Sequence, residues 1–516
     1  MIIKNNFFRL FIFILIIGLY FFSRFQNLTS IPVFGDEAIY IRWAQIIQSE
    51  ETLRFIPQTD GKQPLFMWLN AVSLKLISDP LVSGRIISVF AGFGIVLMLF
   101  FTTALILNYS SLEKNIFKFI KESIKNKFYP SILTSLIYCL IPFSFFFDRL
   151  ALADTLLSFF GLTSLLFTLL LSKYPRLDLS LILGFILGLA WLTKSPAIYF
   201  IVLSIGTFIF LKKKTKIYDL ISTVYLPLIS SFISFIIYNI LRLGPQFHMI
   251  YLRNRDYVWS LNEVIKHPLD PLKPHISDTI TLYQNYISWP IIILALIGLV
   301  FYLYQKKSFQ KIFLIPIFWW ILPLIATASI AKVFTARYIL FTLPHLIIIL
   351  SILISFILSR INKTFVKVIL LISIFVLNIN FIIKLSIDPF HQNLPSTETG
   401  YLSDWTSGWG ISQSAAFLKE RSKKANIIVG TEGNFGTLPD GLQIYGNKVS
   451  QLTIIGLGLG FTNIPNNLVD AKNHGDEVYL LINKSRLKIN SSDLNQMTLV
   501  DSFNKPQNDE LLLYQL

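Results

Sequence analysis

The sequence has little cysteine and little charge. Cys139 is the one cysteine among 516 residues, which excludes an intrachain disulfide and a cysteine metal cluster. Only 14% of the residues are charged, whereas 53% are hydrophobic and the mean hydropathy is +0.61. A soluble protein cannot bury that much apolar surface, so the composition indicates an α-helical polytopic membrane protein.

Acidic residues are scarcer than basic ones, 29 against 45, which gives a net charge of +16. The excess Lys and Arg residues stand mainly in loops between apolar runs. This distribution is typical of membrane topology and of attraction to anionic lipid headgroups. We therefore expect membrane lipids as partners and no nucleic acid.

Apolar runs long enough to cross a bilayer, about 15 to 25 residues each, occur about eleven times. The run at 64–78 is shorter and contains Lys75, so it predicts an amphipathic helix in the interface. The first run is expected to remain as an uncleaved anchor, because Phe, Tyr and Arg follow it where a cleavage site needs small residues. The spanning runs lie near 7–23, 84–107, 129–147, 153–172, 179–194, 196–211, 218–240, 289–304, 312–330, 338–358 and 366–384.

The basic loops orient this arrangement. With 64–78 excluded as a span, all the basic segments fall on one side, so the positive-inside rule places the N-terminus in the cytoplasm of a multi-pass plasma-membrane protein. The opposite side then holds the loops 24–83, 148–154 and 241–288 and everything after residue 384. The basic segments are Lys4 with Arg9, 113–128, 173–176, 212–216, 306–311 and 360–367.

The last part of the chain differs in composition, being rich in Gly, Asn, Ser and Asp. Apolar strands at 426–430, 478–483 and 511–516 alternate with helical stretches such as 411–421. We therefore expect a membrane domain at 1–384 and a small extracytoplasmic α/β domain at 385–516.

Two adjacent acids, Asp36 and Glu37, follow the first apolar run. Tyr40 shares a helix face with Asp36 at i, i+4. The pair either serves chemistry or caps the helix that it begins, since acids favour the first turn. Lys62 precedes Pro64, the first residue of the short helix, where a cation and the helix dipole favour an anion. The alternative for Lys62 is that its side chain only snorkels, placing the ammonium at the membrane–water interface.

Further charges stand at the outer ends of the predicted spans. Asp148, Arg149 and Asp154 occupy one turn, which indicates either a polar pocket or a structural ion pair. Cations on the outer face oppose the positive-inside bias, so they indicate an anionic partner. The cations are Lys194, Lys332 and Arg337, and further polar candidates are His248, His267 and His275, read either as metal ligands or as plain loop residues, and Glu432, read either as a sugar ligand or as a turn residue.

Six motifs occur in the order and spacing of a known family. Together they resemble the membrane glycosyltransferases of the GT-C fold, and in particular the protein O-mannosyltransferases and aminoarabinose lipid A transferases (glycosyltransferase families 39 and 83). The resemblance covers the chain to about residue 358. The motifs are FGDEAIYIRWAQ, KQPLFMWL, SGRIISVFAG, DRLALADTLLSFF, GLAWLTKSPA and ARYILFTLPHL.

The resemblance implies that a sugar passes from a polyprenyl phosphate carrier to a protein, lipid or glycan hydroxyl outside the membrane, with inversion. It implies a GT-C domain with about eleven transmembrane helices, followed by the extracytoplasmic α/β domain. Asp36 is expected as the catalytic base, with Glu37 beside it. The carrier phosphate is expected at Lys62, Arg85, Arg149, Lys194 and Arg337, and the remaining substrate contacts at Tyr40, Asp148, Asp154 and Tyr338.

Two positions depart from the aminoarabinose branch. That branch has Arg where this chain has Ile39, and a Glu that can hold a metal where this chain has Gly61. No cofactor is therefore assigned, although a divalent cation stays open. The rival interpretations are a non-catalytic subunit that has kept the fold and a transporter or flippase for polyprenyl-linked glycans. Transporters bind near the bilayer midplane, whereas these charges gather at the outer helix ends.

Overall fold

The computed structural model describes residues 2–211, 217–304 and 310–516, which form two compact units. The helical unit comprises Met1–Gln26, Phe55–Phe66 and Ile87–Ile383. The sheet unit comprises Asn27–Arg54, Met67–Ile86 and Lys384–Leu516. The acid pair near the N-terminus thus belongs to the same compact unit as the C-terminal strands.

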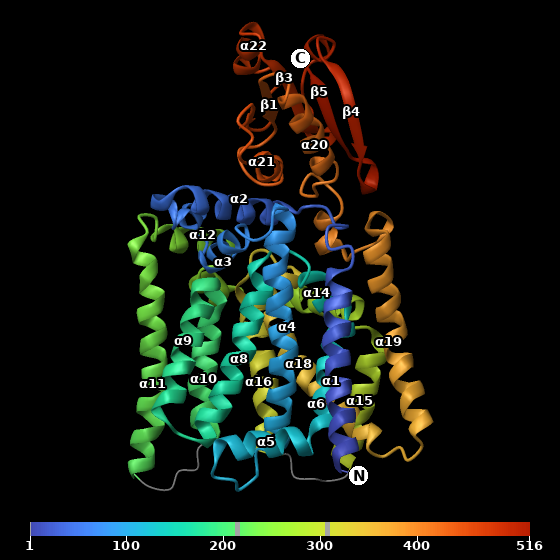
Figure 1. Cartoon of the computed structure of the whole chain (residues 1–516). Coiled ribbons are helices and arrows are strands. Elements are labelled where there is room, and N and C mark those ends of the chain that lie inside the picture. Colours follow the sequence, from blue (N-terminus) through green and yellow to red (C-terminus); the bar gives the residue numbers. More distant parts are fainter. Residues whose placement is uncertain (1, 212–216, 305–309) are drawn as a thin grey trace. The chain divides into compact units, whose positions relative to one another are not determined.

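Helices make up nearly all of the helical unit (Figure 1). The helices that belong wholly or mainly to it are α1 (Ile2–Phe25), α4 (Pro80–Leu107), α5 (Ile116–Asn126), α6 (Phe128–Leu140), α7 (Pro142–Phe147), α8 (Ala153–Lys173), α9 (Leu177–Thr193), α10 (Ile198–Leu211), α11 (Ile217–Tyr238), α12 (Met249–Tyr257), α13 (Leu261–Lys266), α14 (Leu272–Tyr286), α15 (Trp289–Tyr304), α16 (Leu314–Ile330), α17 (Ala336–Ile339), α18 (Leu343–Leu358) and α19 (Thr364–Ile387).

Within the described ranges, seven helices are long and apolar enough to cross a membrane, and an eighth is added if α14 and α15, bent by 107°, form one span. Three shorter apolar helices cover Phe128–Leu140, Leu177–Thr193 and Ser195–Leu211. The protein is therefore a multi-pass membrane protein, while the number of eleven spans stays a prediction. The basic segments 212–216 and 306–309 lie outside the described residues.

The sequence pattern predicted one helix over the apolar run 129–147, and this prediction is wrong. The run is divided into α6 and α7 at Ile141, whose backbone is extended (φ −89°, ψ 141°). The residue that follows is Pro142, whose ring disfavours the helical conformation in the residue before it. This break places Asp148 at the end of a six-residue helix instead of at the end of a long span.

Small residues bring α9 and α11 close together, and the two helices lie side by side in Figure 1. A Cβ atom at Gly184 would lie 2.8 Å from Ser230 O, and one at Gly188 would lie 2.7 Å from the Ile237 side chain. Glycines four residues apart allow two backbones to approach, as in other membrane helix pairs. Ser180 Oγ donates to Leu226 O at 2.6 Å and fixes the same contact.

The sheet unit contains a five-stranded sheet with the strand order β2-β1-β3-β5-β4. The first three strands in this order are parallel, β5 pairs antiparallel with β3, and β4 pairs antiparallel with β5. The predicted α/β character of the C-terminal part is thereby confirmed, while its bounds and its place outside the membrane stay predictions. The strands are β1 (Ile427–Thr431), β2 (Leu452–Gly456), β3 (Glu477–Asn483), β4 (Thr498–Asn504) and β5 (Glu510–Gln515), and the helices of the unit are α2 (Gly35–Ser49), α3 (Leu65–Ser73), α20 (Ile411–Ser422), α21 (Asp440–Gly446), α22 (Asn466–Asn473) and α23 (Ser491–Leu494).

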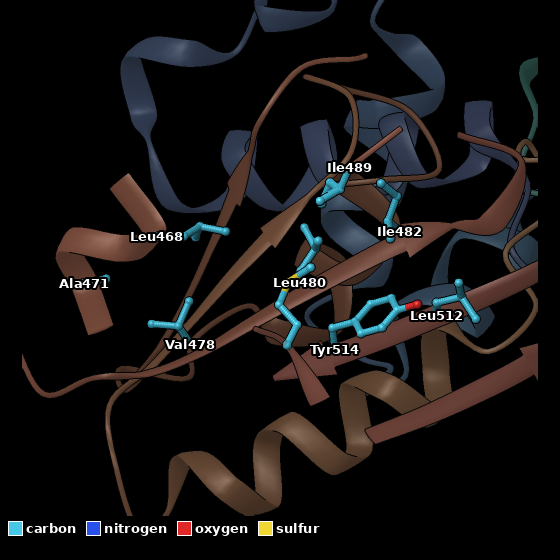
Figure 2. Close-up of a cluster of buried hydrophobic side chains, with 9 residues drawn as sticks. Leu468, Ala471, Val478, Leu480, Ile482, Ile489, Leu512 and Tyr514 are labelled. Carbon is cyan, nitrogen blue, oxygen red and sulfur yellow. The ribbon is translucent and has the colours of Figure 1, made fainter. Parts of the chain in front are cut away.

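Both faces of the central strand β3 are covered. Figure 2 shows Val478 and Leu480 in the apolar cluster that Leu468 of α22 joins, and all three are almost fully buried. The intervening Tyr479 meets Phe417 of α20, with ring centroids 5.8 Å apart. Successive side chains of a strand point to opposite faces of the sheet. Because both faces are covered here, β3 has a continuous run of apolar residues instead of an alternating pattern.

The helix α2 is held by the C-terminal part of the sheet unit. Gln45 Nε2 donates to Ile444 O of α21 at 2.8 Å, and the backbone N–H of Gly35 donates to Thr406 O at 3.1 Å. The N–H of Gly408 donates to Val33 O at 2.9 Å. The acid pair therefore sits on a helix whose position depends on residues that follow it by hundreds of positions.

Candidate active site

The acid pair begins α2, and its two members differ in environment. Glu37 is fully buried, whereas Asp36 is only partly buried. Glu37 Oε2 accepts a hydrogen bond from the backbone N–H of Phe34 at 3.0 Å, which caps the helix from its third position. Asp36 shares a helix face with Tyr40, which is buried beside Trp43 with ring centroids 6.1 Å apart. Asp36 is thus the acid of the pair that a reactant can reach.

Arg85 binds the buried acid with both arms of its guanidinium. Its Nε lies 2.9 Å from Glu37 Oε1 and its Nη2 lies 2.8 Å from Glu37 Oε2. Neither side chain is exposed. The remaining N–H groups of Arg85 donate to the carbonyl oxygens of Leu28, Ile31 and Pro32, at 2.7 to 3.0 Å. This geometry is that of a pair that fixes the segment before α2, since no face of Arg85 is open to a phosphate.

Lys62 of the helical unit belongs to a cluster of charges around Tyr257. Its Nζ lies 5.3 Å from the Tyr257 ring centroid and 3.9 Å from Asp60 Oδ2. Arg253 of α12 shares both partners, with its Nε 3.0 Å from Asp60 Oδ1 and its Cζ 5.4 Å from the same ring. Gly61 makes this possible: its φ is +65°, and a Cβ atom there would lie 2.4 Å from Arg253 Cβ. No side chain fits where the aminoarabinose branch has its Glu.

A second cluster forms around Tyr338. Lys194 Nζ lies 4.9 Å from the Tyr338 ring centroid, and Arg337 Cζ lies 5.2 Å from it. Lys194 also forms an ion pair with the nearly buried Asp154, at 2.6 Å. Lys194 is extended (φ −164°, ψ 148°) because α9 ends one residue before it, and this leads the chain away from the helix axis. Four of the predicted site residues therefore meet here.

One hydrogen bond links the two clusters. Gln63 Nε2, next to Lys62, donates to Ser195 Oγ, next to Lys194, at 2.7 Å. We call the four cations of the two clusters, Lys62, Arg253, Lys194 and Arg337, the cation cluster. Lys62 and Arg253 share the carboxylate of Asp60, Arg253 also meets the exposed Asp256, and Lys194 meets Asp154.

The two acids of the 148–154 turn have different partners. Asp148 is fully buried and accepts hydrogen bonds from Tyr138 Oη at 2.8 Å and from Tyr20 Oη at 3.2 Å. Arg24 Nε lies 3.4 Å from the same carboxylate. Arg149 is buried with its Cζ 4.7 Å above the Phe145 ring. The Asp148 contacts are those of an ion pair that joins α1, α6 and α7, which favours the structural alternative for this acid.

Among the described residues, no group of three or more His, Cys, Asp and Glu side chains is placed to hold a metal ion. The sequence pattern also missed part of the site, namely Asp60, Gln63, Ser195, Arg253 and Tyr257. Arg253 could have been found, because it is a further cation in an outer loop. Gln63 and Ser195 are ordinary polar residues, and only the fold brings them together.

The sequence matches no family model and no curated protein. Solved structures do match. ArnT from Cupriavidus metallidurans in the apo state aligns over 99% of this chain and 98% of its own, with a TM-score of 0.56 at 11% identity. ArnT bound to undecaprenyl phosphate aligns over 98% and 97%, with a TM-score of 0.56 at 13% identity. The chain has the GT-C fold. The fold class predicted from the motifs is therefore confirmed.

A further match covers less of the chain. The Pmt1–Pmt2 protein O-mannosyltransferase complex of S. cerevisiae, bound to its sugar donor, aligns over 46% of this chain and 34% of its own, with a TM-score of 0.34 at 16% identity. The GT-C assignment depends on the two full-length alignments alone.

Proposed function

We propose that the protein is an integral membrane glycosyltransferase. It moves a sugar from a polyprenyl phosphate carrier to a hydroxyl of a protein, lipid or glycan acceptor on the extracytoplasmic side. The observation that carries the proposal is the cation cluster, in which Lys62 and Arg253 flank one tyrosine and Lys194 and Arg337 flank another. Several cations held close together can donate charge-assisted hydrogen bonds to the oxygens of one phosphate, so the cluster suits this anion. The undecaprenyl phosphate bound by ArnT, which has the same fold, supports this choice of ligand.

The roles follow from charge and access. Asp36 is assigned as the base, because it is the accessible member of the acid pair. Glu37 and Arg85 are assigned as positioning residues, which revises the expectation that Arg85 binds the phosphate. The cation cluster stabilises the phosphate as it leaves.

In the reaction, the acceptor oxygen attacks the anomeric carbon of the sugar while its proton passes to Asp36. The bond between that carbon and the phosphate oxygen breaks, and its electron pair stays on the phosphate, which departs without a proton. Because the phosphate occupies one face of the anomeric carbon, direct attack comes from the other and inverts the configuration.

The orientation of the chain is part of the proposal. The N-terminus lies in the cytoplasm, and the loops that hold Asp36, Lys62, Arg253 and Lys194 lie outside the plasma membrane. The division into a membrane part at 1–384 and an extracytoplasmic part at 385–516 is proposed on the same basis.

The test is an assay of the full chain in nanodiscs with a panel of radiolabelled polyprenyl phosphate sugars. Transfer to an added acceptor, or release of free polyprenyl phosphate, is expected with at least one donor. Lys62→Met and Arg253→Met should each weaken carrier use about tenfold or more, as loss of a charge-assisted hydrogen bond would. Lys118→Met is the matched control, since Lys118 is an exposed lysine paired with Glu113 in another loop. Equal activity of all three variants would contradict the phosphate assignment.

A further inference from the structure

A pocket lies in the helical unit, on the outer loop that follows α11. Its lining includes Trp259, Glu263 and Asp270 from this loop, His275 of α14, and Lys332 from the segment after α16, and its volume is about 460 Å³. This volume is in the range of pockets that hold small molecules. None of these residues belongs to the cation cluster.

The walls of the pocket are fixed by backbone contacts. Val258 and Ala331 form an antiparallel bridge, flanked by hydrogen bonds from Trp259 N to Ile330 O at 2.7 Å and from Lys332 N to Tyr257 O at 2.8 Å. The bridge keeps the indole of Trp259 and the ammonium of Lys332 together, with Nζ 4.9 Å from the ring centroid. A pocket with held walls needs little ordering when a ligand binds.

The helical sides are held as well. Ser260 and Glu263 form a reciprocal capping box at the start of α13, in which Ser260 N donates to Glu263 Oε2 at 2.8 Å. His275 Nδ1 lies 2.8 Å from Ala328 O, and its ring stacks on Phe334 at 4.5 Å between centroids. A carbonyl oxygen only accepts hydrogen bonds, so Nδ1 carries the proton, and in the neutral ring Nε2 is left as an acceptor.

The mixture of groups favours a neutral ligand rich in hydroxyls. An anion would meet the carboxylates of Glu263 and Asp270, and a cation would meet Lys332. A hydroxyl both donates and accepts, so a sugar can bind the carboxylates, the imidazole and the ammonium at the same time. Trp259 is 40% exposed and offers an aromatic face to the apolar C–H face of a sugar ring.

The pocket is also close in sequence to the cation cluster. Trp259 is two residues after Tyr257, the ring that Lys62 and Arg253 share, and two residues of extended chain span about 7 Å. Lys332 Nζ donates to Arg255 O at 2.8 Å, two residues before the same tyrosine. A sugar held at Trp259 would therefore lie next to the proposed phosphate site.

We infer that this pocket binds a sugar ring of the acceptor, so that the acceptor is a glycan or a glycolipid. The inference rests on the proposed function, which it makes more specific. The probes are the methyl glycosides of glucose, mannose, galactose and N-acetylglucosamine, added to the full chain in nanodiscs. Saturation-transfer NMR then reports which ring protons contact the protein.

At least one glycoside is expected to receive saturation, and Trp259→Ala should reduce the signal about fivefold or more, as loss of an aromatic contact would. Trp405→Ala is the matched control, because Trp405 is also 40% exposed and also lies beneath a cation, with Arg486 Cζ 3.5 Å from its ring. Glu263→Gln provides a second variant, since Gln can keep the capping box while the charge is lost. It should weaken the signal without lowering the unfolding temperature.

Two results would overturn the inference: no saturation of any glycoside, or equal saturation in the wild type and in Trp259→Ala. Photo-crosslinking with a polyprenyl phosphate probe separates this failure from failure of the proposed function. If the probe crosslinks, Lys62→Met weakens this crosslinking and no glycoside receives saturation, the sugar-binding pocket is rejected and the proposed glycosyltransferase function is retained. If a glycoside signal depends on Trp259 but the probe does not crosslink, sugar binding at the pocket is retained and the use of a polyprenyl phosphate carrier is rejected.

Discussion

Glu37 and Arg85 form a two-armed ion pair from which solvent is wholly excluded, with N···O distances of 2.8 and 2.9 Å. The pair holds the chain that leads into α2, because Arg85 also binds three carbonyl oxygens of residues 28–32. A buried pair of this kind is weak evidence for net stability, yet the loss of one partner leaves an uncompensated charge. The consequence is a helix start whose geometry is set by a residue on a distant helix.

Glu37→Gln is therefore expected to lower the free energy of unfolding by about 3 to 5 kcal/mol, although glutamine can keep the capping box. Thermal unfolding of the purified chain measures the effect. The control is Asp178→Asn, which breaks the ion pair with Arg176, both side chains of which are 53% exposed. That variant should change stability far less than Glu37→Gln does, because the exposed pair is screened by solvent. Similar shifts in the two variants would show that the buried pair has no special role.

Asp36→Asn should reduce turnover by roughly 100-fold or more, because asparagine keeps the size of the side chain but cannot accept the acceptor's proton. Carrier crosslinking should stay normal, since the cation cluster is unchanged. Glu51→Gln is the control, as Glu51 is an exposed acid that follows α2 in the same unit. Near-normal turnover of a correctly folded Asp36→Asn protein would remove Asp36 from the mechanism.

Gly61→Ala is expected to destabilise the protein and to weaken carrier binding. The positive φ alone costs about 1 kcal/mol, and the added methyl would force Arg253 away from Asp60. Gly460→Ala isolates the backbone cost, because Gly460 has φ +75° with no atom within 4 Å of a Cβ. Thermal unfolding and carrier crosslinking of both variants give the comparison. If only stability falls in Gly61→Ala, the position of Arg253 is not important for the carrier.

The stability of the sheet unit should depend on pH through Asp440. Burial raises the pKa of Asp440 to about 6, although the N–H of Gly436 donates to the carboxylate at 2.6 Å and opposes the shift. The folded chain thus binds this proton more tightly than the unfolded chain. The resulting stabilisation is full below about pH 4 and is lost as the pH rises through 6, by up to about 3 kcal/mol.

Asp440→Asn removes this dependence while its amide oxygen can still accept from Gly436. Relative to the wild type, the variant should be more stable at pH 7.5 than at pH 4.5, as measured by thermal unfolding at the two values. A constant difference between the two proteins would mean that Asp440 titrates normally.

The orientation of the chain can be tested with single cysteines in intact cells. Ser78→Cys, in the exposed segment after α3, should react with an impermeant thiol reagent added outside. Lys121→Cys, exposed on α5, should react only after the cells are opened. The native Cys139 is buried and provides little background. The opposite pattern would reverse the proposed topology.

The strands of the sheet could be predicted in part. The apolar segments at 426–430, 478–483 and 511–516 form β1, β3 and β5, and the stretch at 411–421 forms α20. The strands β2 and β4 were missed, and both lie at the sheet edges; five of the seven residues of β4 are exposed, among them Asp501 and Ser502. An edge strand needs few apolar residues and so lacks a pattern.

The site could be predicted only as separate charges. No sequence pattern pairs Glu37 with Arg85 or separates Asp148 from Asp154. Those partnerships depend on how the helices pack: Asp148 follows the short helix that begins at Pro142, and it contacts Arg24 of α1 and Tyr138 of α6. The assignments of individual residues to catalysis and to the carrier stay predictions.

The composition of the sheet unit has a consequence for biogenesis. The segment Asn27–Arg54 leaves the ribosome long before Lys384–Leu516, yet the two belong to one compact unit. At ordinary rates of synthesis the first segment waits on the order of tens of seconds for its partners. During this interval Ala38 and Ile41, both fully buried in the finished protein, have no C-terminal residues to cover them. A nascent chain of this protein should therefore depend on chaperones at the membrane until its last strand has been delivered.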